Sequence, residues 1–222
     1  MALWTEAVNA EYDELIAAST ETGKALLMDE RVLFFIQLDC RRASLEQEAP
    51  ENAAMLISEQ LMNKCADLCY EAHAETEERS DSQYNGLWTE AIAPEAAETC
   101  LRVVAADGTL VRYQEDLCQR HRKPEQTVDA LLRDSDSLEK RANAWQSAKH
   151  LWLVELDALT NEKYLAADAA GRAIIAAERV SFGNWLNARE TLLQLMYPGR
   201  PEIVNEVIAD TIRARVIDLC GK

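Results

Sequence analysis

Glycine and proline are scarce in this sequence. Its 222 residues include only 7 Gly and 5 Pro, whereas Ala, Leu, Glu and Arg, which lose little side-chain freedom in a helix, are plentiful. Long apolar runs are lacking as well, since none approaches the roughly 20 residues of a transmembrane helix. The sequence therefore predicts an all-α protein without a membrane span, long enough to bury a core without staples.

Basic residues are also few. The formal net charge of -16 argues against nucleic acid or an anionic membrane surface as a partner, because phosphate binding needs clustered Lys and Arg. Residues 1–86 hold 18 Asp/Glu against 6 Lys/Arg, whereas 87–150 and 151–222 each carry only two more acidic than basic residues. The acidity is therefore concentrated in the first part of the chain, and we expect a basic protein partner.

A signal peptide is not evident at the start. The first twelve residues, "MALWTEAVNAEY", lack the basic start and apolar centre of a secretory leader. We expect a periplasmic or secreted protein if a leader has been removed, and otherwise a cytoplasmic one. The six Cys are too few for a disulfide scaffold in a chain of this length and do not decide the compartment.

One phrase of the sequence occurs twice. "GRAIIAAERVSFGNW" at 171–185 is similar to "GKALLMDERVLFFIQ" at 23–37, at an offset of 148 residues. The same offset places Leu3-Trp4 on Leu151-Trp152. An offset of 151, which needs a three-residue insertion, then aligns Pro50-Glu51 with Pro201-Glu202 and the "DLC" of 67–69 with that of 218–220.

These landmarks predict a duplicated three-helix module with an up-down-up arrangement, covering residues 3–69 and 151–220. In each copy the second helix should follow the Gly of the phrase, and the third should begin at the Pro. From Ser137 to about Tyr197 the pattern is helical, which allows one long or kinked helix, or two. The predicted domains are a strongly acidic first helical module (1–80), a linker and helical middle segment (81–150), and a second helical module (151–222).

Three residues have the spacing of a metal site. Cys65, Cys69 and His73 stand at i, i+4 and i+8, so on a helix they would share one face and could offer two sulfurs and a nitrogen to zinc. The paired CxxC geometry of a zinc module is missing, which favours buried Cys or a disulfide instead. Cys40 and Cys65 are the disulfide candidate because both are absent from the second module, where Ala188 and Val216 match them. Whether they meet depends on packing.

Catalytic patterns are lacking. The three His have helical, charged surroundings, and neither a nucleophile elbow nor a phosphate-cradling Gly-rich loop is present. We therefore predict a protein that is not an enzyme, with no catalytic residues and no cofactor. The stretch "YEAHAETEERSD" at 70–81 has two interpretations: a solvated helix end, or a surface that steers a basic partner. The candidate partner-binding residues in it are Glu71, Glu75, Glu77, Glu78 and Asp81.

The second module resembles the LprI-type lysozyme-inhibitor family. The stretches that carry the resemblance are "LTNEKYL" (159–165), "AERVSFGNWLNARETLL" (177–193) and "IADTIRARVIDL" (208–219). They contain an Asn-x-x-Tyr step, a Trp followed by an Arg–acid pair, and a closing Thr/Arg/Leu helix. The matching residues are Asn161 and Tyr164, then Trp185, Arg189 and Glu190, then Thr211, Arg215 and Leu219.

The first module repeats this pattern more faintly, with Asn9, Tyr12 and Arg41, and with Gln37 in place of the Trp. The Cys that the family places after the Arg–acid pair is Leu193 in this chain. The resemblance implies a bacterial, non-enzymatic protein that neutralises a basic enzyme, as an inhibitor or an immunity protein. Its target would be a lysozyme, another cell-wall hydrolase or a toxin. The alternative that suits the same composition is an acidic helical adaptor or secretion chaperone in the bacterial cytosol.

Overall fold

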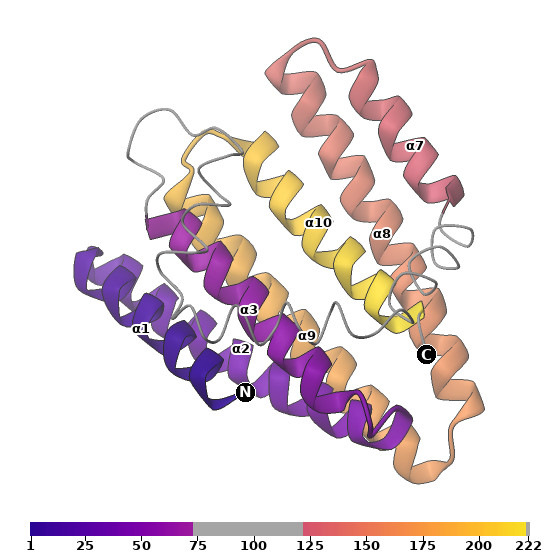
Figure 1. Cartoon of the computed structure of the whole chain (residues 1–222). Coiled ribbons are helices and arrows are strands. Elements are labelled where there is room, and N and C mark those ends of the chain that lie inside the picture. Colours follow the sequence, from indigo (N-terminus) through magenta and orange to yellow (C-terminus); the bar gives the residue numbers. More distant parts are fainter. Residues whose placement is uncertain (73–121, 221–222) are drawn as a thin grey trace. The chain divides into compact units, whose positions relative to one another are not determined.

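The protein is all-α throughout the part of the chain that the computed structural model describes, residues 1–72 and 122–220. These ranges contain seven helices and no strand, which confirms the predicted fold class (Figure 1). The helices are α1 (Ala2–Ala18), α2 (Glu21–Glu48), α3 (Ala53–Ala72), α7 (Arg122–Arg133), α8 (Leu138–Ala166), α9 (Ala169–Met196) and α10 (Pro201–Cys220). Within the same ranges, no helix has both the length and the apolar content needed to cross a membrane.

Side-chain caps set the starts of the long helices. The Thr20 hydroxyl accepts a hydrogen bond from the Gly23 N–H at 3.3 Å, and the Asp168 carboxylate accepts one from the Gly171 N–H at 2.8 Å. Each cap satisfies one of the N–H groups that the first turn leaves without a helical partner. The second helix of each module therefore begins two residues before the repeated Gly, whereas we predicted that it would follow the Gly.

The helical pattern between 137 and 197 consists of two helices rather than one. Ser137 caps α8 by accepting a hydrogen bond from the Lys140 N–H, and the chain is extended at Ala167 and Asp168 before α9 begins. Because α8 begins at Leu138, the predicted boundary between the middle segment and the second module, at residue 151, lies inside a helix.

The chain divides into two compact units. The first unit comprises Met1–Val32 and Arg41–Gly108, and the second comprises Leu33–Cys40 and Thr109–Lys222. In the first unit, α1 and α3 lie side by side. They bury apolar residues spaced three or four apart, which is the periodicity of one helical face. These residues are Trp4, Val8, Tyr12 and Leu15 on α1, and Ile57, Leu61, Cys65 and Leu68 on α3.

In the second unit, α10 packs along α8, and α7 packs on α8 (Figure 1). Trp152 on α8 and Ile208 and Ile212 on α10 are almost completely buried. An aromatic cluster extends this core, with the Phe182 and Trp185 ring centroids 5.7 Å apart. Tilted rings at such a separation add to the stabilisation that comes from burial alone.

The helices that contain the repeated phrase correspond in length and in buried positions. Both α2 and α9 have 28 residues, and the bounds of α9 are those of α2 shifted by 148. These correspondences agree with the predicted duplication, which stays a prediction. The pairs buried in both helices are Leu27 and Ile175, Glu30 and Glu178, Phe34 and Phe182, Gln37 and Trp185, Leu38 and Leu186, Arg41 and Arg189, Ser44 and Leu192, and Leu45 and Leu193.

The third helices differ at their starts. Pro201 is the first residue of α10, as predicted, but the prediction for the first module was wrong, because α3 begins at Ala53 and Pro50 lies in a turn. The Asn52 N–H donates to the Ala49 carbonyl at 3.0 Å and closes that turn. The loop before α10 contains Gly199 at φ 75°, a conformation that favours Gly because it has no Cβ.

Candidate partner-binding surface

A buried ion pair lies at the centre of the first unit. Lys64 Nζ on α3 donates to Glu30 Oε1 on α2 at 2.7 Å, and the side chains are 2% and 0% exposed. The Tyr12 hydroxyl on α1 donates to the other oxygen of Glu30, and Lys64 Nζ stands 5.3 Å from the centroid of the Tyr12 ring. Burying a charge is tolerable when it is paired and hydrogen bonded, so this cluster ties the three helices of the unit together.

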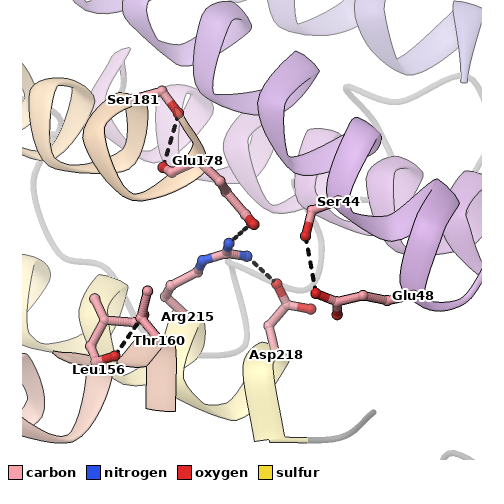
Figure 2. Close-up of polar contacts among 8 residues, drawn as sticks. All are labelled: Ser44, Glu48, Leu156, Thr160, Glu178, Ser181, Arg215 and Asp218. Atoms are coloured by element: carbon pink, nitrogen blue, oxygen red, sulfur yellow. Dashed lines mark hydrogen bonds and ion pairs between the residues drawn. The ribbon is translucent and has the colours of Figure 1, made fainter. Parts of the chain in front are cut away.

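The second unit has a matching ion pair. The Arg215 guanidinium on α10 forms an ion pair with Glu178 on α9 and a second one, at 2.6 Å, with Asp218 (Figure 2). Arg215 and Glu178 are both buried, and Ser181 donates to the Glu178 carbonyl at 3.0 Å. Glu178 corresponds to Glu30 at an offset of 148, and Arg215 corresponds to Lys64 at an offset of 151. Both units thus bury a glutamate of the repeated phrase against a cation of the third helix.

These buried pairs affect the charge on the surface. Residues 1–68, which we call the N-terminal stretch, contain five basic residues. Lys64 and Arg41 are buried, and Lys24, Arg31 and Arg42 are half-buried. Lys24 pairs with Glu21 at 2.8 Å, and Arg31 pairs with Asp13 at 2.7 Å. No basic side chain of this stretch is therefore classed as exposed.

The carboxylates of the same stretch point outward. Of its 13 Asp and Glu residues, only Glu30 is buried. The result is a predominantly negative surface, on which eleven exposed carboxylates outnumber three half-buried cations, and such a surface raises the local concentration of cationic partners. The exposed acidic residues are Glu6, Asp13, Glu14, Glu21, Asp29, Asp39, Glu46, Glu48, Glu51, Glu59 and Asp67.

The five acidic residues predicted from the sequence to bind a partner lie mainly outside the described residues. Glu71 lies in the last turn of α3, but its side chain is outside the described residues. Glu75, Glu77, Glu78 and Asp81 also lie outside the described residues. The described structure therefore neither brings these five residues together nor separates them, and their role in partner binding stays a prediction.

The cysteine predictions are only partly covered by the structure. Cys40 is half-buried, and its disulfide with Cys65 stays a prediction. Cys65 is buried, whereas the side chains of Cys69 and His73 lie outside the described residues. Among the side chains that the structure does describe, no group of three His, Cys, Asp or Glu could hold a metal ion.

A pair of acidic groups on α10 has perturbed ionisation. Burial, together with the neighbouring Asp210, raises the pKa of Glu206, and Arg141 partly opposes this shift. Desolvation by neighbouring atoms also raises the pKa of Asp210, although its side chain is partly open to solvent, and Arg213 opposes this shift whereas Glu125 reinforces it. A raised pKa means that the folded state disfavours the ionised form, so each carboxylate costs stability at neutral pH.

We expect Glu206→Gln to raise the free energy of unfolding at pH 7, by less than about 1 kcal/mol because the group is only half-buried. The gain should shrink as the pH falls through the raised pKa, and it should vanish below the ordinary value of 4.5, where the wild-type carboxyl is protonated in both states. Urea unfolding at several pH values measures this gain in the free energy of unfolding. Asp129→Asn, at an exposed position of α7, is the control, and a gain that persists at pH 3 would contradict the prediction.

Some of the residues that carry the family resemblance are buried, and others are exposed. Trp185 and Arg189 are buried on α9, and Glu190 pairs with Lys149 of α8 at 2.5 Å. The two Asn-x-x-Tyr steps do not occupy equivalent positions, because Tyr12 is buried against Glu30 whereas Tyr164 is 41% exposed. At the offset of 148 the steps are displaced by one helical turn.

Comparisons with known protein families, with curated proteins and with solved structures find no match for this chain.

Proposed function

We propose that this protein is a non-enzymatic binding protein that neutralises a basic enzyme, such as a lysozyme, another cell-wall hydrolase or a toxin. The observation that supports the proposal is the segregation of charge in the N-terminal stretch. Its basic side chains are buried, half-buried or held in ion pairs, while eleven of its carboxylates are exposed. A predominantly negative helical surface steers a cationic protein towards it and speeds the encounter.

The internal ion pairs make this surface rigid as well as acidic. Glu30 and Lys64 link α2 to α3 from within, and all the exposed carboxylates of the stretch except Glu51 lie on helices. A surface that is ordered before the partner arrives loses less conformational entropy on binding. This arrangement favours a stoichiometric inhibitor or immunity protein over a disordered acidic tail.

The proposal predicts inhibition of a lysozyme in an assay of cell-wall lysis. We expect inhibition that saturates near one protein per enzyme at low salt and weakens at physiological salt, because exposed charges are screened beyond about 8–10 Å. Isothermal titration at the two salt concentrations gives the affinity. The control is cytochrome c, which is basic but does not act on cell walls.

Absence of inhibition at both salt concentrations would overturn the proposal for lysozyme. Equal affinity for lysozyme and cytochrome c would indicate a general binder of basic proteins, as expected of an acidic adaptor or chaperone.

A further inference from the structure

The outward side of α2 has an apolar centre. Met28, Val32 and Ile36 are 56%, 58% and 47% exposed. Their i, i+4, i+8 spacing places them in a row on one side of the helix, about 12 Å long. Ala25 and Ala43 are exposed and continue the row in both directions. We call these five residues the α2 apolar row. Large apolar side chains aligned in this way on one helix suit a packing partner better than they suit water.

Carboxylates accompany the row, and exposed cations are absent from this helix. Glu21, Asp29, Asp39 and Glu46 are exposed on the same side of α2, at positions three or four residues from members of the row or directly beside them. Every basic residue of α2 is buried or half-buried, and Lys24 and Arg31 are held by Glu21 and Asp13. A partner for this side of α2 would need both an apolar strip and positive charge.

The corresponding side of α9 lacks the four carboxylates and two of the three large apolar side chains. At the offset of 148, Ala169, Ala177, Asn187 and Gln194 stand in place of the four carboxylates. Ala176 and Asn184 replace Met28 and Ile36, whereas Val32 and Ala25 recur as Val180 and Ala173. The exposed charged residues of α9 are Arg172 and Arg179, which are basic. The acidic and apolar character of α2 is therefore not a requirement of this kind of helix.

We propose that the α2 apolar row and its four carboxylates form the docking surface for an amphipathic, basic helix of the target protein. This inference rests on the proposed function and names its surface. Apolar residues of the partner helix pack on Met28, Val32 and Ile36, and Lys or Arg residues along its edges meet the carboxylates. The four negative charges oppose a second copy of the same surface, because like charges facing each other are repelled.

A designed peptide pair tests the surface without the natural target. One peptide is a 14-residue Leu/Lys sequence with leucines on one helical side, and the other has the same composition in scrambled order. We expect the full-length protein to bind the amphipathic peptide at least tenfold more tightly than the scrambled one. Met28→Ala/Ile36→Asn, which installs the residues of α9, should weaken this binding about tenfold, since exposed apolar residues at an interface centre act as anchors.

Asp29→Ala/Asp39→Asn/Glu46→Gln, which also installs residues of α9, should weaken binding at low salt and flatten its salt dependence. The matched control for the apolar variant is Val180→Ala, at the exposed counterpart of Val32. The matched control for the charge variant is Asp129→Asn/Asp134→Asn/Glu139→Gln, which removes three exposed charges from α7, the following turn and α8. Neither control should change peptide binding. Circular dichroism melts establish that every variant is folded.

Equal binding of the two peptides, or unchanged binding by both α2 variants, would overturn the proposed surface. Self-association of the wild type that the Met28→Ala/Ile36→Asn variant abolishes would also overturn it, because a second copy would then be the occupant. Lysozyme inhibition that survives both α2 variants would leave the proposed function standing and remove this surface. Peptide binding through α2 without lysozyme inhibition would leave this surface standing and overturn the proposed function for lysozyme.

Discussion

Replacing Lys64 with Met is expected to lower the free energy of unfolding of the first unit by about 3–5 kcal/mol. Lys64 lies 2.7 Å from Glu30, and neither side chain is more than 2% exposed. The substitution leaves the carboxylate inside a packed core without its cation, while the Tyr12 hydroxyl can supply only a neutral hydrogen bond. A buried charge that loses its counter-ion is among the most destabilising changes in proteins. Urea unfolding followed by circular dichroism measures the loss.

The double substitution Glu30→Gln/Lys64→Met distinguishes this cause from a general packing defect. Because it removes both charges together, it should recover much of the stability that Lys64→Met loses. Lys24→Met is the control, since the pair of Lys24 with Glu21 is at the surface and such pairs contribute little. If Lys64→Met costs less than about 1 kcal/mol, the ion pair does not hold the unit together.

Arg215→Met is expected to have an effect of similar size, about 3–5 kcal/mol, on the second unit. It removes one guanidinium that serves two carboxylates, so Glu178 stays buried and loses the cation beside it, and Asp218 loses its partner at 2.6 Å. Arg215→Lys should be milder, because an ammonium keeps the charge but lacks the planar, forked geometry that reaches two carboxylates at once. Urea unfolding of the three proteins gives the order wild type, Arg215→Lys, Arg215→Met.

Arg213→Met serves as the control for Arg215. Its side chain is 41% exposed and pairs with Glu125, so its loss should cost about 1 kcal/mol or less. Equal losses for Arg213→Met and Arg215→Met would show that burial of the cation does not determine the cost.

The sequence was sufficient for the helical class. Of the four helix starts that it predicted, only that of α10 was right, although local chemistry marks the starts of α2, α8 and α9. Thr20, Ser137 and Asp168 are N-cap residues whose side chains bind the first turn of their helices, and such residues favour that position wherever the chain enters a helix. The start of α3 was not predictable in the same way. Pro50 suits a first helical turn as well as Pro201 does, and the turn closed by Ala49 and Asn52 decides between them.

The buried ion pairs could not be predicted from the local sequence, for a physical reason. A Lys in an acidic, helical sequence is usually solvated, and nothing local distinguishes Lys64 from an exposed Lys. The signal was present only in the comparison of the two modules, where Glu30 aligns with Glu178 at one offset and Lys64 with Arg215 at another. The α2 apolar row was missed because Met28, Val32 and Ile36 repeat like core residues, and only packing shows that they face outward.

The sequestration of cations in the N-terminal stretch also determines which proteases can cut the folded chain. Trypsin cleaves after Lys and Arg, and every such residue of residues 1–68 is buried or half-buried within a helix, so tryptic cleavage there has to wait for unfolding. A glutamate-specific protease meets a different situation, because Glu51 is exposed in the turn between α2 and α3. A cut at that peptide bond separates the segment that carries Glu30 from the one that carries Lys64. The two fragments then stay together only through the same buried contacts that fold the intact unit.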